Sequence, residues 1–417
     1  MFRFRKRRQK ERFGFETIKG LPNTTLECLE FVWAQNENTE WYGGPDWELK
    51  AFTPRSAYTF AWLARRIDPQ GPLLQRVGER VARKFAATQS PEGYFDYTGE
   101  RVSADLTYDL QLEINYGGRK SERLDFELYD MVHTYDLVRL LKLADTPLKD
   151  RDGLIAWINA AQTPQGRFST EDRYNQMYAE RTSRKKADRM GLYHPTIGAR
   201  AYEEIKETAL AVLILAELGA EPRNRRTCID WLQSYQSQEG YFHGPAYPDY
   251  YDYAIDREDP LSDDIRDYID GFPEFDTPWA VFALDALGET PRDLQACIDW
   301  LVPKRRYPNA DWTGKRWKDS LTGAKQWLWE WETIEALYCL GWKPSPEEWE
   351  LWRTEMIEVR TGGLFPLTYP LSWRLGKSMK DPPFPLLGFS DLDVTYFNLY
   401  YLDMINALDE SMLETMR

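Results

Sequence analysis

Three short stretches of the sequence are versions of one pattern: QSPEGYF at 89–95, QTPQGRF at 162–168 and QSQEGYF at 236–242. Each has a Gln first, a Gly four residues later and a Phe two residues after the Gly. Their first residues lie 73 and 74 positions apart, a spacing typical of a chain built from similar structural units. The Gly favours a turn after a helix, and we expect the aromatic residue to fix that turn to the core.

Two kinds of predicted helix precede each repeat string. The nearer helix is amphipathic, as in LIAWINAAQ at 154–162 and CIDWLQSYQ at 228–236, with apolar residues at i, i+3 and i+4. The helix before it is apolar on nearly every side, as in ETALAVLILAELG at 207–219 and DTPWAVFALDALG at 276–288. A helix that is apolar all round has to be buried on all sides. The sequence therefore predicts buried inner helices and half-exposed outer helices.

Both kinds of helix recur along the chain. Inner helices are predicted to begin near Ser56, His133, Glu207, Asp276, Glu332 and Asp393. Outer helices are predicted at 24–36, 72–88, 150–162, 224–236, 292–304 and 345–359. Because the first helix is an outer one and the last an inner one, the helix near 24–36 is expected to pack beside the helix near 391–409 and close a ring. The predicted fold is all-α, an (α/α)6 toroid of six helical hairpins.

The predicted connections alternate in length. Those from an inner to an outer helix are short, with Gly219 and Gly288 placed as helix C-caps. Those from an outer to the next inner helix are long, at about 96–125, 169–203, 243–274, 306–327 and 366–390. Long loops inside a compact domain are usually functional. We therefore expect an active site on the face from which the long connections emerge.

Composition excludes several classes of protein. The chain has 417 residues, 15% of them aromatic, and a formal net charge of −14, which argues against a nucleic-acid-binding protein. No apolar run reaches the roughly 18 residues of a transmembrane helix. Four cysteines, Cys28, Cys228, Cys297 and Cys339, form no CxxC pair, so nothing in the sequence requires an oxidising compartment. These features predict a cytoplasmic protein.

Residues 1–20 are predicted to form a basic tail in front of a single domain at 21–417. MFRFRKRRQKERF at 1–13 carries seven Lys and Arg residues and no apolar signal core. One interpretation is a solvated tail. The alternative is peripheral contact with a membrane through Coulomb attraction to anionic lipids. The oligomeric state is not predicted.

The pairing of a Gln-xxx-Gly-x-aromatic turn with an inner helix led by Asp-Thr resembles a known repeat. Squalene–hopene cyclases, other class II terpenoid cyclases and protein prenyltransferase β subunits carry it, and the resemblance covers about residues 24–410. It implies an enzyme that acts on an isoprenoid, or an isoprenoid diphosphate, in a central cavity lined by aromatic side chains. Most class II cyclases have two helical domains, whereas this chain has room for one.

The segment SDLDVTYF at 390–397 carries the resemblance to the chemistry of those cyclases. Class II cyclases have an Asp-x-Asp-Asp-Thr motif whose middle Asp protonates an alkene or epoxide. Asp393 matches that proton donor and Asp391 its supporting Asp, but Val394 replaces the final Asp. A carboxyl that donates a proton at neutral pH needs burial or a neighbouring carboxylate to raise its pKa. The alternative is that these Asp residues cap their own helix.

Aromatic and basic residues supply the candidates for substrate binding. Aromatic ring faces stabilise carbocations, and basic loop clusters suit a diphosphate. The substrate-binding candidates are Thr395, Tyr396, Trp279, Trp331, Arg184, Lys185, Arg316 and Lys318. The alternatives are core packing for the aromatic residues and ordinary solvated charge for the basic ones.

Metal sites and other functions are less well supported by the sequence. No zinc site is predicted, because the three histidines form no ligand set with the cysteines. The acidic segment 249–270 would attract Mg²⁺ together with a diphosphate, although its spacing matches no metal-binding loop. Two alternative functions stay open: an (α/α)6 glycan-processing enzyme with two carboxyl groups about 5–10 Å apart, and a non-catalytic binding scaffold, which Val394 favours.

Overall fold

A computed structural model of the chain describes most of the predicted helices and the turns between them. The residues described are 24–36, 54–84, 129–169, 204–244, 272–307, 331–350 and 389–404, with shorter pieces at 86, 89–91, 93, 95, 328–329, 406, 408–414, 416 and 417. Within these ranges the protein is all-α, apart from one antiparallel pair of two-residue strands. The strands are β1 (Arg306–Tyr307) and β2 (Leu328–Trp329), in which Arg306 pairs with Trp329.

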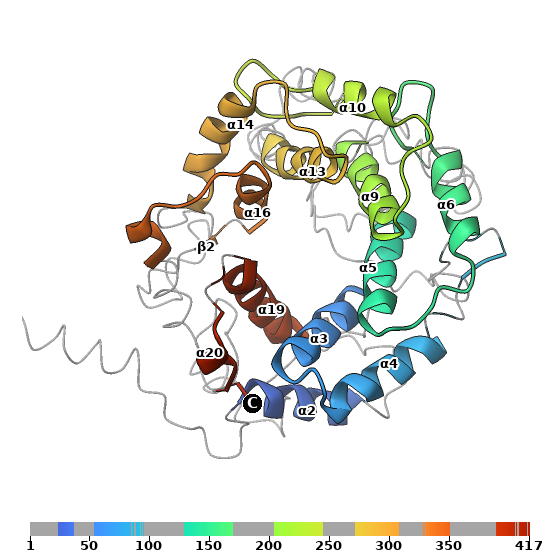
Figure 1. The fold of residues 1–417 in the computed structure, drawn as a ribbon, viewed down its shortest axis with the longest axis vertical. Coiled ribbons are helices and arrows are strands. Elements are labelled where there is room, and N and C mark those ends of the chain that lie inside the picture. The colour runs from blue at the N-terminus through green and yellow to red at the C-terminus, as the bar shows by residue number, and fades with distance from the viewer. Residues whose placement is uncertain are drawn as a thin grey trace, which may run out of the picture.

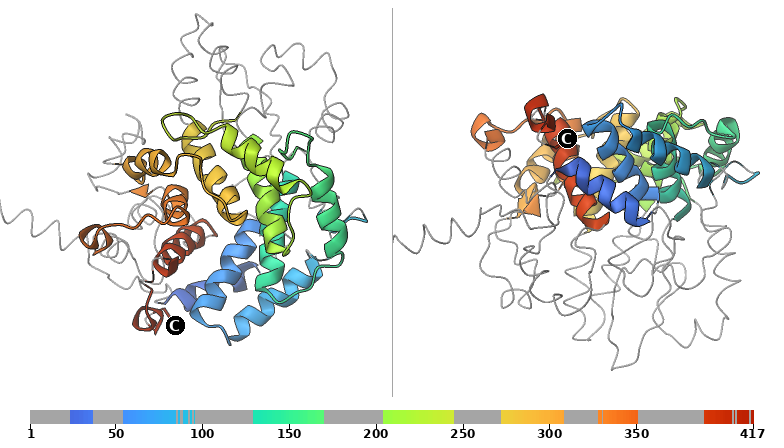
Figure 2. Two further views of the ribbon diagram at one scale, coloured as in Figure 1. Left: turned by 45° about the horizontal axis from the view of Figure 1, so that its top comes forward. Right: turned by 90° about the horizontal axis from the view of Figure 1, so that it is seen from below.

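The helices form two concentric layers. The inner layer consists of α3 (Pro54–Ile67), α5 (Tyr129–Leu143), α9 (Glu204–Glu217), α13 (Phe272–Ala286), α16 (Trp331–Cys339) and α19 (Phe389–Met404). Each of these packs against the next, and α19 packs against α3, so that they follow one another round a ring (Figure 1). Figure 2 shows this ring edge-on as a single flat layer.

The outer layer consists of α2 (Thr25–Asn36), α4 (Pro72–Lys84), α6 (Arg151–Ala160), α10 (Arg225–Ser234) and α14 (Leu294–Leu301), which lie outside the inner helices (Figure 1). The 3₁₀ turn η3 (Val302–Lys304) extends α14, and the short helix α20 (Glu410–Glu414) follows α19. The predicted outer helices at 24–36, 150–162 and 224–236 are confirmed to within two residues at each end. The predicted helix at 345–359 is described only at 346–350.

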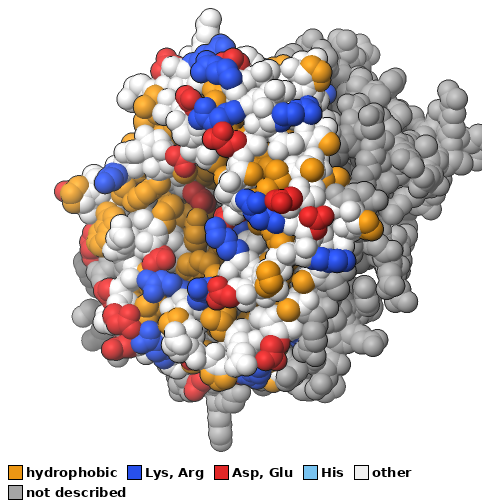
Figure 3. All heavy atoms as spheres, turned by 45° about the vertical axis from the view of Figure 1, so that its right-hand side comes forward, with side chains coloured by type: hydrophobic (Ala, Val, Ile, Leu, Met, Phe, Trp, Pro, Cys, Tyr) orange, Lys and Arg blue, Asp and Glu red, His pale blue; other side chains and the backbone are white. Residues whose placement is uncertain are grey.

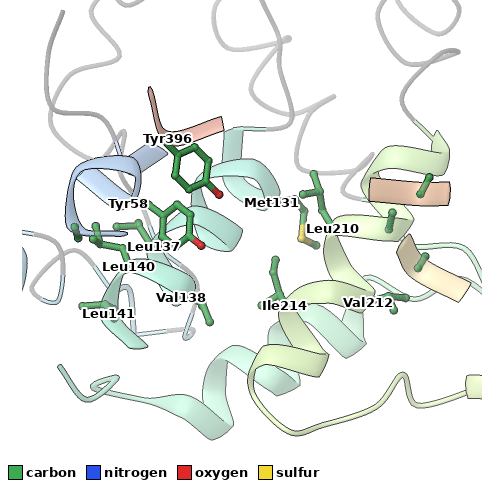
Figure 4. Close-up of a cluster of buried hydrophobic side chains, with 14 of the residues drawn as sticks. Tyr58, Met131, Leu137, Val138, Leu140, Leu141, Leu210, Val212, Ile214 and Tyr396 are labelled. Atoms are coloured by element: carbon green, nitrogen blue, oxygen red, sulfur yellow. The ribbon is translucent and has the colours of Figure 1, made fainter. Parts of the chain in front are cut away.

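Burial follows the predicted difference between the layers. Residues 207–212 of α9 are all buried, and Figure 4 shows Leu210, Val212 and Ile214 of this helix in the core. On the outer helix α10, Cys228, Ile229, Trp231 and Leu232 are buried, whereas Arg226 and Asp230 on its other side are exposed. An inner helix is thus apolar on most sides because it contacts neighbours on most sides.

The Gln of each repeat string joins its own turn to the next outer helix. Its backbone pairs with that of the Phe in an isolated antiparallel bridge. The Gln236 amide nitrogen donates to the carbonyl oxygens of Gly240 at 3.3 Å and Asp293 at 2.8 Å, and its Oε1 accepts from the Asp293 amide at 3.0 Å. The same three bonds link Gln89 to Gly93 and Asp150, and Gln162 to Gly166 and Asn224. Because Asp293, Asp150 and Asn224 are N-cap residues, each Gln fixes the start of the helix that follows.

The Gly of each repeat string is required for two reasons. Gly240 has a φ of 98°, a positive backbone angle that residues other than glycine rarely adopt. A Cβ atom at this position would also lie 2.2 Å from the backbone of Ala296 in α14. Gly93 and Gly166 have the same conformation and make the same close approach to α6 and α10. The turn can therefore pack directly on the next outer helix.

Inner helices end in left-handed residues, which confirms the predicted C-caps Gly219 (φ 64°) and Gly288 (φ 69°). The residue after each Gly then donates its backbone amide to a carbonyl oxygen five residues earlier in the helix. Ala220 N donates to Leu215 O, and Glu289 N donates to Leu284 O, each at 2.8 Å. The same conformation follows α5, α16 and α19, at Asp145, Gly341 and Asn406.

A buried Thr recurs near the start of every described inner helix. These residues are Thr59, Thr134, Thr208, Thr277, Thr333 and Thr395, none more than 4% exposed. The hydroxyl oxygens of Thr208 and Thr277 accept hydrogen bonds from the amides of Phe168 and Phe242, the last residues of two repeat strings. The Asp276 carboxylate accepts from the Gly244 amide at 2.9 Å. Each of these two turns is therefore attached to the start of the next inner helix.

The inner helices begin one to four residues before the predicted starts, from one residue at Glu332 to four at His133, Asp276 and Asp393. Helix α13 begins at Phe272, four residues before Asp276, and α19 begins at Phe389, four residues before Asp393. Capping of the helix is the alternative role that the sequence allows for Asp393. Asp276 instead bonds to the preceding connection at Gly244 and lies inside its helix, which continues upstream of it.

The two ends of the described chain meet. Helix α19 packs on α3, and Arg66 pairs with Asp403 across that contact at 2.7 Å. Beyond α19, the carbonyl oxygen of Met416 accepts from the Leu26 amide at 2.8 Å, which places the C-terminal residues beside α2 (Figure 1). The expected direct packing of α2 on α19 is not among the substantial contacts between the described helices; α2 instead packs on α3 and bonds to Met416 after α20.

We predict that Gly240→Ala destabilises the fold by about 3 kcal/mol or more, because the new Cβ would collide with the backbone of α14. The matched control is Gly219→Ala, which also has a positive φ but no atom within 4 Å of its Cβ position. That variant should lose only about 1–2 kcal/mol from left-handed strain. Urea unfolding measures both, and equal losses would contradict the packed turn.

Candidate functional site in the ring centre

Five of the inner helices have a partly exposed side chain at the same level. Five residues after the buried Thr stand Arg139, Leu213, Phe282, Tyr338 and Tyr400, and all five side chains are partly exposed although most of their neighbours are buried. Ala64 of α3 stands at the same level and is buried. The outer helices lie outside the inner ones (Figure 1), so the exposed parts of the inner helices are those that the outer layer leaves uncovered.

Arg139 of α5 is the positively charged residue among these partly exposed side chains. Its Nη2 donates to the Tyr58 hydroxyl oxygen at 2.5 Å. Its guanidinium carbon lies 4.1 Å from the centroid of the Tyr58 ring and 4.9 Å from that of the Tyr135 ring. Cation–π contacts of this kind stabilise a charge that is removed from bulk water.

Aromatic rings from α3 and α19 surround Arg139. The Tyr396 ring lies 5.9 Å from the Tyr58 ring and 5.1 Å from the Trp62 ring, both edge to face. The Tyr400 ring lies 5.9 Å from Trp62 and 5.5 Å from Tyr396. Figure 4 shows the hydroxyl groups of Tyr58 and Tyr396 pointing in the same direction. Burial raises the pKa of both hydroxyls, so these tyrosines are neutral at physiological pH.

Glu335 of α16 is a carboxyl group on the same surface. Its Oε1 accepts from the Tyr400 hydroxyl at 2.7 Å and its Oε2 from the Tyr401 hydroxyl at 3.4 Å. Burial raises the pKa of Glu335 above its usual value, while the tyrosine hydrogen bonds and the charge of Arg139 act in the opposite direction. Carboxyl groups whose pKa is raised by burial are common among groups that exchange protons in functional sites.

The opposite side of the ring centre is more apolar. Trp279 and Phe282 of α13 lie edge to face, with ring centroids 5.7 Å apart. The Lys206 ammonium group of α9 lies 5.7 Å from the centroid of the Trp279 ring. Phe275, one turn before Trp279 on the same helix, is 56% exposed. Helix α13 therefore presents an apolar surface that begins at the N-terminal end of the inner helices.

The structure places the predicted site residues in different surroundings. Tyr396 of α19 and Trp279 of α13 lie on inner helices, where Tyr396 is buried against Trp62 and Trp279 packs against Phe282. Thr395 is fully buried at the repeated Thr position, so the structure assigns it to the core rather than to a binding surface. Asp391 and Asp393 lie in the first two turns of α19, and Trp331 is the first residue of α16.

Several predicted features lie outside the described residues. These are the side chains of Asp391, Asp393 and Trp331, the basic loop residues Arg184, Lys185, Arg316 and Lys318, the acidic segment 249–270 and the tail 1–20. In the part of the chain that is described, Lys and Arg side chains are interspersed with Asp and Glu ones on the face that Figure 3 shows. No group of three or more metal-ligating side chains occurs among the described residues.

Sequence reasoning missed Arg139, Tyr58 and Glu335. The signal that identifies them is their register relative to the repeated Thr, because Arg139 stands five residues after Thr134 and Glu335 two residues after Thr333. Their helices are mostly apolar in sequence. A single polar residue in such a helix does not change the periodic pattern of apolar residues, so the pattern does not mark it as functional. Only the ring shows that these two residues and Tyr58 come from different helices to one place.

The cysteines and the length of the helices bear on two expectations from the sequence. All four cysteines carry free thiols, and burial raises the pKa of Cys228 and Cys297 to about 12, so they behave as small apolar residues. Among the described helices, none has both the length and the apolar character needed to cross a lipid bilayer.

No protein-family model matches the sequence, and a comparison with curated proteins finds no match.

We predict that Glu335→Gln changes the pH dependence of stability. Because the pKa of Glu335 is raised in the folded state, the folded chain keeps a proton that the unfolded chain releases as the pH rises above about 4.5. The native carboxyl therefore lowers the free energy of unfolding as the pH rises, by about 1.4 kcal/mol for each unit by which its pKa is raised. The variant, which does not titrate, should gain stability relative to the natural protein over this range.

Urea unfolding between about pH 4.5 and pH 7.5 tests this expectation. The control is Glu239→Gln, which removes an exposed carboxyl group of a repeat turn. A difference for Glu335→Gln that does not vary with pH would show that this carboxyl titrates as it does in the unfolded chain.

Proposed function

We propose that this protein is an (α/α)6 toroid enzyme that binds an isoprenoid, or an isoprenoid diphosphate, in the ring centre and transforms it by protonation, in the manner of class II terpenoid cyclases. The observation that carries the proposal is the meeting of aromatic and ionisable side chains from several inner helices at one partly exposed place. Sites for small ligands are concave and mostly apolar, with a few polar groups that fix orientation.

The apolar part of the proposed site suits an isoprenoid chain. Trp279, Phe282 and the partly exposed Trp62 present ring surface to the centre. Aromatic faces attract a carbocation by about 0.5–2 kcal/mol each. Because Arg139 already occupies the face of Tyr58 with a positive charge, the carbocation would form on the α13 side rather than beside α5.

Asp393 is the proposed proton donor, supported by Asp391. Both lie at the N-terminal end of an inner helix, where the described connections from α6 and α10 also reach the inner layer. Val394 stands directly before the repeated Thr, where α13 has Asp276, whose carboxylate bonds to the Gly244 amide. The residue lost at Val394 is thus equivalent to a structural carboxylate in this chain, and its absence does not argue against Asp393 as donor.

One observation favours a second candidate function, glycan processing. Glu332 and Glu335 lie one helical turn apart on α16, both partly exposed, with tyrosine rings beside Glu335. Paired carboxyl groups and aromatic platforms are the usual parts of a glycoside hydrolase site. Hydrolysis of a glycan by the purified protein, lost in both Glu332→Gln and Glu335→Gln, would replace the isoprenoid proposal.

We predict that Asp393→Asn abolishes conversion of the isoprenoid substrate while the fold survives. General acid catalysis contributes about 10²- to 10⁴-fold, and the amide cannot supply the proton. The measurement is product formation from farnesyl and geranylgeranyl diphosphate, followed by mass spectrometry. Asp152→Asn, at a side chain that is 91% exposed, is the matched control and should retain full activity. Normal turnover by the Asp393→Asn variant, with circular dichroism unchanged, would rule out Asp393 as the donor.

A further inference from the structure

Arg139 carries a positive charge, and no direct ion pair joins it to a described carboxylate. Its one hydrogen bond among the described residues goes to the neutral Tyr58 hydroxyl, and Asp136 and Glu335 act on it through Coulomb attraction without bonding to it. Arg66 and Lys142 differ, since they pair with Asp403 and Glu217, each at 2.7 Å. A guanidinium that is largely removed from bulk water gains from a directly bonded anion, which a ligand would supply here.

Two tyrosine rings lie beside the guanidinium group. Its carbon atom is 4.1 Å from the centroid of the Tyr58 ring and 4.9 Å from that of the Tyr135 ring. Of the three nitrogens, only Nη2 donates to a described residue, which leaves Nε and Nη1 for a ligand. Guanidinium donors form a planar fork that matches two oxygen atoms of a carboxylate or phosphate.

The surroundings allow an anion to reach Arg139. Its side chain is partly exposed at the level where the neighbouring inner helices also face the ring centre. The two nearby carboxyl groups, Asp136 and Glu335, attract Arg139 but form no hydrogen bond or ion pair with it. Among the described residues they therefore leave Nε and Nη1 of the guanidinium group available.

We propose that Arg139 is an oxyanion-binding site, which holds a phosphate or carboxylate group of the ligand in the ring centre. The inference rests on the proposed function for the identity of that group, the diphosphate of an isoprenoid. The proposed binding site for the anion is thus on the inner layer. The sequence instead predicts it at the basic loop clusters around Arg184 and Arg316. The diphosphate would then lie against α5 and the isoprenoid chain against α13.

Isothermal titration calorimetry of the full chain with inorganic pyrophosphate and with succinate tests the proposal. Arg139→Gln removes the charge and the fork, and pyrophosphate binding should weaken at least about tenfold, the effect of losing a charged hydrogen bond. Arg139→Lys keeps the charge without the fork and should lose part of that affinity. Arg226→Gln, on the exposed side of α10, is the matched control and should bind as the natural protein does.

Each outcome decides the proposal. Failure of the natural protein to bind either anion, or equal binding by Arg139→Gln, would overturn it. If the Gln variant does not fold, the Arg139→Lys titration decides in its place. Binding of succinate but not pyrophosphate would support the oxyanion site and reject the diphosphate. Farnesyl diphosphate separates the two proposals, because an affinity no higher than that of pyrophosphate would reject the isoprenoid and leave the Arg139 site in place.

Discussion

The hydrogen bonds of one side-chain amide, the Gln of the repeat string, set the geometry on which the rest of the molecule depends. In each of three hairpins this amide bonds to the carbonyl oxygen of its own turn and to both backbone groups of the next N-cap residue. A carboxylate at this position would lack the two donors, and a shorter side chain would not reach. Because the Gly of the same turn packs on the backbone of the next outer helix, the position of one hairpin determines the position of the next. Repetition of this link, rather than any single contact, places the inner helices round a common centre.

The functional consequence follows from the shared register of the inner helices. The buried Thr208 and Thr277 attach two repeat turns to the starts of the next inner helices, and the other described inner helices carry a buried Thr at a similar level. Arg139, Glu335 and Tyr400 come together from three helices that are far apart in sequence. Charges so far inside a protein are stabilised by specific partners, here tyrosine rings and hydroxyls, or they bind ligands. The ring thus combines an apolar wall on α13 with a polar one shared by α5, α16 and α19.

Much of the fold could be predicted from the sequence, because its signals are local. The Gln-Gly-Phe spacing, the two kinds of hydrophobic pattern and the C-cap glycines Gly219 and Gly288 each depend on neighbouring residues, and each is confirmed. The starts of the inner helices could not be predicted in this way, since Asp276 bonds to a residue 32 positions earlier rather than to its own helix. The polar group at the ring centre was missed for the same reason, as Arg139 and Tyr58 are 81 positions apart. Asp393 and Asp391 were found only through the resemblance of their motif to that of the terpenoid cyclases.

The most direct test of this account is an experimental structure of the protein crystallised with an unreactive analogue of farnesyl diphosphate. The account predicts density in the ring centre, with the diphosphate on the Arg139 guanidinium group, the isoprenoid chain across Trp279 and Phe282, and Asp393 at its end. Density for the analogue only on the outer surface, or a ring centre filled by the side chains of the protein itself, would contradict it.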